Sequence, residues 1–215
     1  MMLFRVITLS ALSLVPVLSQ PVFTDVFPAG EYAGRRAAVM KAIGDGVAIL
    51  QGTTERPGEQ PFRQSNQFFY LTGVVEPRAI LLIDGRKKTS TLFLKPRDER
   101  REKMMFGPGL YPGPEAVRPT GIETVLPRNE FKAAVAGIAK DHVAIYTPFR
   151  PEVLGSSSSS DTIALARATK NDEWDGRSSR EEAFREKLKA ASPESEIKDL
   201  DPILDRLRSI GVCSY

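Results

Sequence analysis

The sequence offers few side chains of the kinds that catalyse hydrolysis or bind metal ions. Its 215 residues include one histidine, His142, and one cysteine, Cys213. A mononuclear zinc hydrolase normally uses two or three histidines, and a Ser-His-Asp hydrolase would need His142 together with a Gly-x-Ser-x-Gly turn that the sequence lacks. We interpret His142 as a structural residue that opens an apolar strand. The sequence therefore predicts no catalytic residue, no metal ligand and no cofactor site in this chain.

Phosphate and nucleic-acid binding are equally unsupported. The stretch 107–109 lacks the Gly-Lys-Ser/Thr of a phosphate-binding loop, and its proline removes a backbone donor. Lys and Arg number 30 against 27 for Asp and Glu, a net charge of +3. In the run 97–103 the two signs alternate, which is typical of a solvated helix face rather than a nucleic-acid patch.

The segment 61–73 is the most distinctive in the chain because it mixes polar residues with a dense aromatic cluster. We expect residues 68–71 to be mostly buried, since each removes a large apolar area from water. The polar residues before them are expected to tether the preceding loop through backbone hydrogen bonds; direct contact with a ligand is the alternative. The candidate substrate-gating or structural residues are Phe62, Arg63, Gln64, Asn66, Tyr70, Thr72 and Gly73.

Apolar runs and turn signals predict the elements that position this segment. Short buried strands are expected at 46–50, 78–84, 89–95, 122–126 and 142–146, with an Asp-Gly hairpin turn at 84–85. Helices are expected at 31–43, 98–105, 129–140, 179–191 and from residue 201 onward. Asp201 is expected to be the N-cap of the last helix. The apolar stripe of the first helix is expected to consist of Ala33, Ala37, Ala38, Met40 and Ile43. The serine tract 156–160 is interpreted as a mobile loop. Alternating strands and helices predict an α/β fold with a mixed β-sheet of about five or six strands flanked by helices.

The first 19 residues have the layout of a secretory signal peptide. Arg5 precedes an apolar run at 6–18, and small residues precede a cleavage point before Gln20. The run is short for a transmembrane span, and a buried N-terminal helix is the alternative. We therefore expect a secreted or periplasmic protein with no membrane span.

Three blocks of sequence carry a resemblance to a known family. The second block runs from Leu92 to Asp98 and the third from Asp201 to Ile210. The matching residues of the first block are Phe62, Arg63, Gln64, Asn66, Phe69, Tyr70, Leu71, Thr72, Gly73, Glu76, Pro77 and Ala79. Together the three blocks resemble the N-terminal domain of aminopeptidase P (Xaa-Pro aminopeptidase), in the creatinase/prolidase superfamily.

The resemblance implies a ribonuclease-H-like domain over 20–200, followed by a truncated linker helix over 201–215. In the family this domain packs beside a catalytic "pita-bread" domain, narrows access to the active site and contributes to oligomer contacts, so a homo-oligomer is an open expectation. The family's two manganese ions are held by residues of that catalytic domain, none of which maps onto this sequence.

The resemblance thus predicts the non-catalytic N-terminal domain of a secreted metallopeptidase. The parent reaction would release an N-terminal residue that precedes proline, with a metal-bound hydroxide as nucleophile, and this chain alone would be inactive. The alternative is a stand-alone interaction module that pairs with a catalytic partner or with itself.

Overall fold

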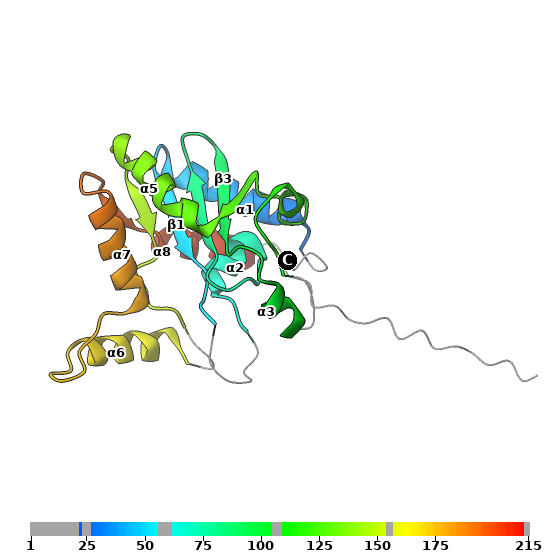
Figure 1. Ribbon diagram of the computed structural model, residues 1–215. Coiled ribbons are helices and arrows are strands. Elements are labelled where there is room, and N and C mark those ends of the chain that lie inside the picture. The colour runs from blue at the N-terminus through cyan, green and yellow to red at the C-terminus, as the bar shows by residue number, and fades with distance from the viewer. Residues whose placement is uncertain (1–21, 23–26, 56–61, 105–108, 154–156, 213–215) are drawn as a thin grey trace, which may run out of the picture.

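The computed structural model describes residues 22, 27–55, 62–104, 109–153 and 157–212 (Figure 1). The predicted signal peptide at 1–19 and Cys213 lie outside the described residues. None of the helices in the described ranges is long and apolar enough to cross a bilayer.

A mixed sheet of six strands forms the centre of the fold, in the order β4-β3-β2-β1-β5-β6. Strand β1 pairs antiparallel with β2 and parallel with β5, while β2 and β3 form an antiparallel hairpin. Two further parallel pairs, β3–β4 and β5–β6, complete the sheet. The strands are β1 (Val47–Gln51), β2 (Ile80–Asp84), β3 (Thr89–Leu94), β4 (Thr124–Pro127), β5 (Ile145–Thr147) and β6 (Ile197–Asp199). The predicted mixed sheet is confirmed.

Helices cover both faces of this sheet (Figure 1). Side chains of α1, α2 and α8 pack on one face, and those of α5 and α7 pack on the other. The helices are α1 (Ala29–Ile43), α2 (Asn66–Thr72), α3 (Glu99–Met104), α4 (Val117–Thr120), α5 (Phe131–Lys140), α6 (Ser159–Lys170), α7 (Arg180–Ala191) and α8 (Asp201–Val212), with short 3-10 turns at Pro114–Ala116 and Arg128–Glu130.

The continuous apolar run of β1 is explained by burial on both sides. Alternate side chains of a strand point to opposite faces of its sheet. Ala48 and Leu50 join the core beneath α1 and α2, whereas Val47 and Ile49 join the core beneath α5 and α7. A strand with two buried faces needs an unbroken apolar sequence.

Helix α1 is confirmed, but its predicted apolar stripe is wrong in part. Ala37 is exposed, and the buried face instead includes Arg36, which is 1% exposed. The guanidinium donates to the carbonyl oxygen of Leu71 at 3.0 Å and also to that of Gly121. A buried arginine is tolerated here because backbone carbonyls replace its water, and it joins α1 to the end of α2.

His142 does not open a strand, contrary to the prediction. It is exposed in the turn after α5, with φ of 50°, and β5 begins only at Ile145. Its amide donates to the carbonyl oxygen of Ala139 at 3.4 Å. The residue therefore takes the left-handed position that ends a helix, where glycine or asparagine is more usual.

The serine tract is also not simply a loop. The Ser158 hydroxyl accepts a hydrogen bond from the amide of Asp161 at 3.1 Å, and the Asp161 carboxylate accepts from the amide of Ser158 at 3.3 Å. This reciprocal capping box starts α6 at Ser159. The serine-rich composition favoured a loop, but the Ser-x-x-Asp spacing within it forms a helix cap.

Candidate functional site

The distinctive segment folds as a short, capped helix. The Ser65 hydroxyl accepts from the amide of Phe68 at 3.2 Å, so α2 begins at Asn66. Gly73 ends the helix in the left-handed conformation, and its amide donates to the carbonyl oxygen of Phe69 at 2.8 Å. Phe68 and Leu71 are fully buried, as predicted, while Phe69 and Tyr70 are only half-buried.

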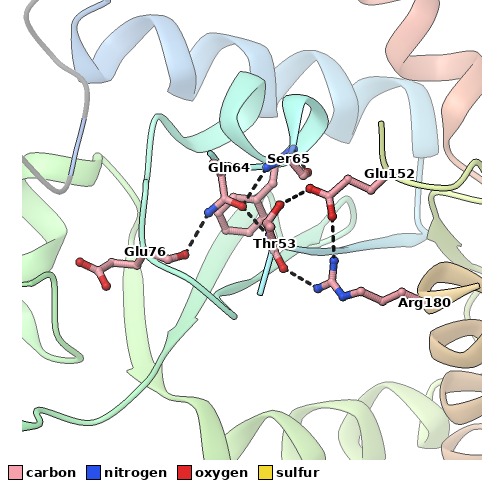
Figure 2. A network of polar contacts seen from close by, with 8 residues as sticks. Thr53, Gln64, Ser65, Glu76, Glu152 and Arg180 are labelled. Atoms are coloured by element: carbon pink, nitrogen blue, oxygen red, sulfur yellow. Dashed lines mark hydrogen bonds and ion pairs between the residues drawn. The ribbon is translucent and has the colours of Figure 1, made fainter. Parts of the chain in front are cut away.

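Gln64 is the hub of a polar network at this end of the sheet (Figure 2). Its Oε1 accepts from the amides of Thr53 at 2.6 Å and Ser65 at 3.0 Å. Its Nε2 donates to the carbonyl oxygens of Val74 at 3.2 Å and Glu76 at 2.9 Å. The side chain is 6% exposed. One amide thus satisfies four backbone groups from three separate segments, which is the tethering role that the sequence predicts.

Thr72 and Gly73 fix the exit from α2. The Thr72 hydroxyl donates to the carbonyl oxygen of Phe68 at 2.8 Å and accepts from the amide of Val74 at 3.1 Å. A Cβ atom at Gly73 would lie 2.6 Å from the ring of Tyr32, and φ is +65°. Both features demand glycine at this position.

The remaining candidates lie nearer solvent. Arg63 and Asn66 are exposed, and Phe62 is half-buried. The Tyr70 ring contacts two guanidinium groups, with the Cζ atoms of Arg35 and Arg208 at 4.5 and 5.1 Å from its centroid. Gln64, Thr72 and Gly73 therefore make contacts with backbone groups that hold the segments around α2 in place. A gating role for the exposed residues stays a prediction.

A cleft of about 110 Å³ lies beside the start of α2, next to the last residues of β1 and β5. Loops after parallel strands commonly form such sites because the carboxyl ends of these strands meet at one edge. The cleft is lined by Gln51, Ser65, Asn66, Gln67, Thr147, Pro148, Arg150, Pro151, Glu152, Val153, Ser159, Arg180, Glu181, Phe184 and Arg208.

Opposite charges hold the wall of this cleft together. The Glu152 carboxylate accepts from the Thr53 hydroxyl and from Arg180 at 3.3 Å (Figure 2). The second guanidinium nitrogen of Arg180 donates to the carbonyl oxygen of Gly52. This arrangement binds the loop after β5 and the first turn of α7 to the end of β1.

Burial shifts the pKa of two ionisable groups in the cleft. It raises the pKa of Glu181 above that of an exposed carboxyl. It also lowers the pKa of the Arg208 guanidinium. The charges of Glu181 and Arg208 are therefore less well solvated than charges on exposed side chains.

Asp201 is the centre of a second polar network, although the sequence predicts a different role for it. The carboxylate of this buried residue accepts from the amides of Phe149 at 2.9 Å and Arg150 at 2.7 Å, and also from the Gln67 side chain. The prediction made Asp201 the N-cap of its own helix. The predicted N-cap role is wrong, because the Asp201 carboxylate binds amides of the loop after β5 instead of amides of its own helix. The Asp201 amide in turn donates to the carboxylate of Asp199 at 2.9 Å. Burial, with the nearby Asp201 charge, raises the pKa of Asp199.

The described residues do not fit a dinuclear metal site. Within those ranges, no group of three or more His, Cys, Asp or Glu side chains is placed to hold an ion. The carboxylate of Glu152 in the cleft is already engaged by Arg180.

The part of the chain that contains the motif at 62–73 matches a known protein family. A family model described as "Aminopeptidase P, N-terminal domain" matches residues 32–146, a stretch that includes β1 to β4 and the hub residue Gln64. The chain belongs to the aminopeptidase P N-terminal domain family.

Curated relatives of this aminopeptidase P domain are longer proteins. A probable Xaa-Pro aminopeptidase of Coccidioides posadasii is 35% identical over 99 residues, which is 44% of this chain and 20% of the relative. One from Emericella nidulans is 30% identical over 135 residues, which is 60% of this chain and 29% of the relative. The chain thus matches less than a third of either protein.

Solved structures share the fold. A Bacillus anthracis protein assigned as an aminopeptidase P superposes with a TM-score of 0.62 at 20% identity, covering 84% of this chain and 40% of that one. Proline aminopeptidase P II from Yersinia pestis superposes with a TM-score of 0.50 at 27% identity, and the match covers 82% of this chain and 38% of that one. Aminopeptidase P from E. coli with the inhibitor Pro-Leu superposes with a TM-score of 0.53 at 20% identity, and the match covers 82% of this chain and 37% of that one. The chain corresponds to about two fifths of these proteins.

Proposed function

We propose that this chain is the non-catalytic N-terminal domain of a secreted, manganese-dependent Xaa-Pro aminopeptidase. The observation that carries the proposal is the family match over 32–146, which spans most of the sheet. The similar proteins are Xaa-Pro aminopeptidases more than twice as long as the aligned part. The parent reaction releases an N-terminal residue that precedes proline, and its metal ions are held by a catalytic domain outside this chain.

The cleft is the feature of the domain that we assign to the peptide path. It opens at the edge of the sheet where the exposed candidate Asn66 lies, and it contains charged groups of both signs. A wall of this kind beside a catalytic site narrows its entrance and so favours short or extended peptides. Gln64 and Asp201 would act as positioning residues, because they hold the loops that shape the wall.

The proposal is tested by assaying the purified chain on an Xaa-Pro peptide with and without added manganese, with the E. coli enzyme as positive control. We expect no release of the N-terminal residue from this chain alone. We also expect elemental analysis to find no stoichiometric manganese. Chelator-sensitive cleavage by the purified chain would contradict the assignment.

A stand-alone interaction module is the second candidate, and one observation favours it. Large hydrophobic side chains are exposed on α6 and in the turn that follows it. If the chain works alone, it binds a protein rather than cleaving one. Stable, inactive protein that binds a separately produced catalytic domain or a second copy of itself would support this candidate over the first.

A further inference from the structure

Two charged groups that line the cleft beside α2 have no partner of opposite charge. They are Glu181, in the first turn of α7, and Arg208, on α8. Within the described ranges neither side chain takes part in an ion pair, with the other or with a third residue. A charge that is partly removed from water and left unpaired costs free energy. These two charges therefore need an explanation beyond packing.

The other charges that line the cleft are neutralised inside the chain. Arg150 pairs with Asp205 at 2.5 Å. Arg180 pairs with Glu152 at 3.3 Å (Figure 2). One negative and one positive charge remain, so the cleft is complementary to a ligand that carries both signs rather than to a simple anion or cation.

Glu181 and Arg208 belong to helices on opposite faces of the sheet. Helix α7 packs on one face and α8 packs on the other (Figure 1). Both side chains nevertheless line one cleft, at the edge where β1 and β5 end. Because they do not pair with each other, a ligand that neutralises both must place a cationic end at the first and an anionic end at the second.

The Arg208 guanidinium has donors available for such a ligand. Its Cζ atom lies 5.1 Å from the centroid of the Tyr70 ring. A cation–π contact of this kind uses none of the five N–H donors of the group. The side chain donates no hydrogen bond to any residue that the structure describes. A planar guanidinium with free donors fits a carboxylate, which it can bind through two parallel hydrogen bonds.

Burial makes both groups receptive to a ligand of opposite charge. It raises the pKa of Glu181, against the nearby charge of Arg180, and it lowers the pKa of Arg208. In each case burial disfavours the charged form. A ligand group of opposite sign supplies the stabilisation that water no longer gives, through charge-assisted hydrogen bonds.

We propose that the cleft binds a short peptide by its two ends, with the terminal ammonium at Glu181 and the terminal carboxylate at Arg208. This inference rests on the assignment of the cleft to the peptide path, and it names the groups that the path recognises. The exposed amide of Asn66 and the ring of Phe184 also line the cleft, where they can contact a peptide group and an apolar side chain.

The size of the cleft limits the ligand and its affinity. Its volume of about 110 Å³ is below the about 300–1,000 Å³ of a drug-sized site. A peptide of two or three residues is about 7–10 Å long when extended, so part of it stays in solvent. We therefore expect a dissociation constant of about 1 mM.

Trialanine tests the proposal, because it has both charged termini and no charged side chain. The isotope-labelled chain would be titrated by NMR with trialanine, N-acetyl-trialanine and trialanine amide, each to about 10 mM, which is tenfold above the expected dissociation constant. We expect saturable shifts in the amide signals of residues 147–153 and 180–184. Each blocked peptide should bind about tenfold or more weakly. Equal binding of the three peptides, or no saturable shift in these residues, would overturn the proposal.

Matched variants assign each end of the peptide. Glu181→Gln should abolish the preference for a free amino end and keep the preference for a free carboxyl end, and Arg208→Gln should do the reverse. Glu186→Gln and Arg206→Gln make the same changes at exposed positions of the same two helices, outside the cleft. Both controls should keep both preferences. If either cleft variant also keeps both, the proposal fails.

The result is separable from that of the activity assay. Binding of trialanine is measured without manganese and needs no cleavage. Its absence would overturn the assignment of the peptide ends and leave the non-catalytic role intact. Chelator-sensitive cleavage of an Xaa-Pro peptide by the purified chain would contradict the non-catalytic role, and end-specific binding of trialanine would still support the assignment of the ends.

Discussion

Replacement of Gln64 by methionine tests whether the motif at 62–73 works mainly as a tether. Methionine has a similar length and shape but no hydrogen-bonding amide. The change leaves four backbone groups without their partner. Two of those hydrogen bonds, with the Thr53 amide and the Val74 carbonyl, are fully buried.

The magnitude follows from these two buried groups. Each costs about 1–3 kcal/mol when left unsatisfied, so we expect Gln64→Met to lower the free energy of unfolding by about 4 kcal/mol. The two partly buried groups add less, because water can reach them. A loss of this size is a large fraction of the about 5–15 kcal/mol that stabilises a typical domain.

The assay is equilibrium urea unfolding, with Arg63→Met as the matched control. Arg63 is the neighbouring motif residue and is exposed, so its replacement should change stability by no more than about 0.5 kcal/mol. The denaturant slope should stay the same in both variants. If Gln64→Met costs less than about 1 kcal/mol, or if Arg63→Met costs as much, the tethering argument is refuted.

Two other predictions concern the exit of α2 and the acid stability of the fold. Gly73→Ala should lower the melting temperature, because the left-handed backbone costs about 1–2 kcal/mol and the new Cβ meets the Tyr32 ring; Gly34→Ala, inside α1 with open space around it, should raise it through a gain of up to about 1 kcal/mol. Shifts of the same sign in the two thermal unfolding curves would contradict this reasoning. For Glu55, burial alone would raise the pKa, but hydrogen bonds from Lys95 and Arg78 outweigh it and lower the pKa to about 2. The stability from these bonds is present above the ordinary carboxyl pKa and is lost as pH falls towards 2, so Glu55→Gln should be less stable than the original chain at pH 6 and equally stable near pH 2. A difference in urea midpoint that persists unchanged at the acid end would show that protonation of this carboxyl is not involved.

Local sequence patterns were sufficient for the central sheet. The strands β1 to β4 were expected within two residues of their observed bounds, and the Asp-Gly turn joins β2 to β3 as predicted. Strands β1 and β2 are buried on both faces, so their apolar runs are long and unambiguous. Edge strand β6 was missed because its three residues are only half-buried and include lysine and aspartate.

Helix α6 was missed for a related reason. A helix is recognised in a sequence by an apolar stripe that faces a core, and α6 has no buried residue to produce one. Its one clear sequence signal is the Ser-x-x-Asp spacing at Ser158 and Asp161, which lies inside a run of serines. The same lack of core contacts leaves Ile163 and Leu165 of α6 exposed.

The motif at 62–73 shows why a recognisable pattern does not by itself define a catalytic or binding role. Gln64, Thr72 and Gly73 resemble the family pattern as closely as Arg63 and Asn66 do, yet the first three contact backbone and the last two face solvent. Sequence spacing cannot separate the two groups, because the partners of Gln64 include the amide of Thr53, eleven positions away. If the domain gates peptides, the exposed pair should affect selectivity without affecting stability. The buried trio should affect both, because the cleft wall depends on the hydrogen bonds that these residues make.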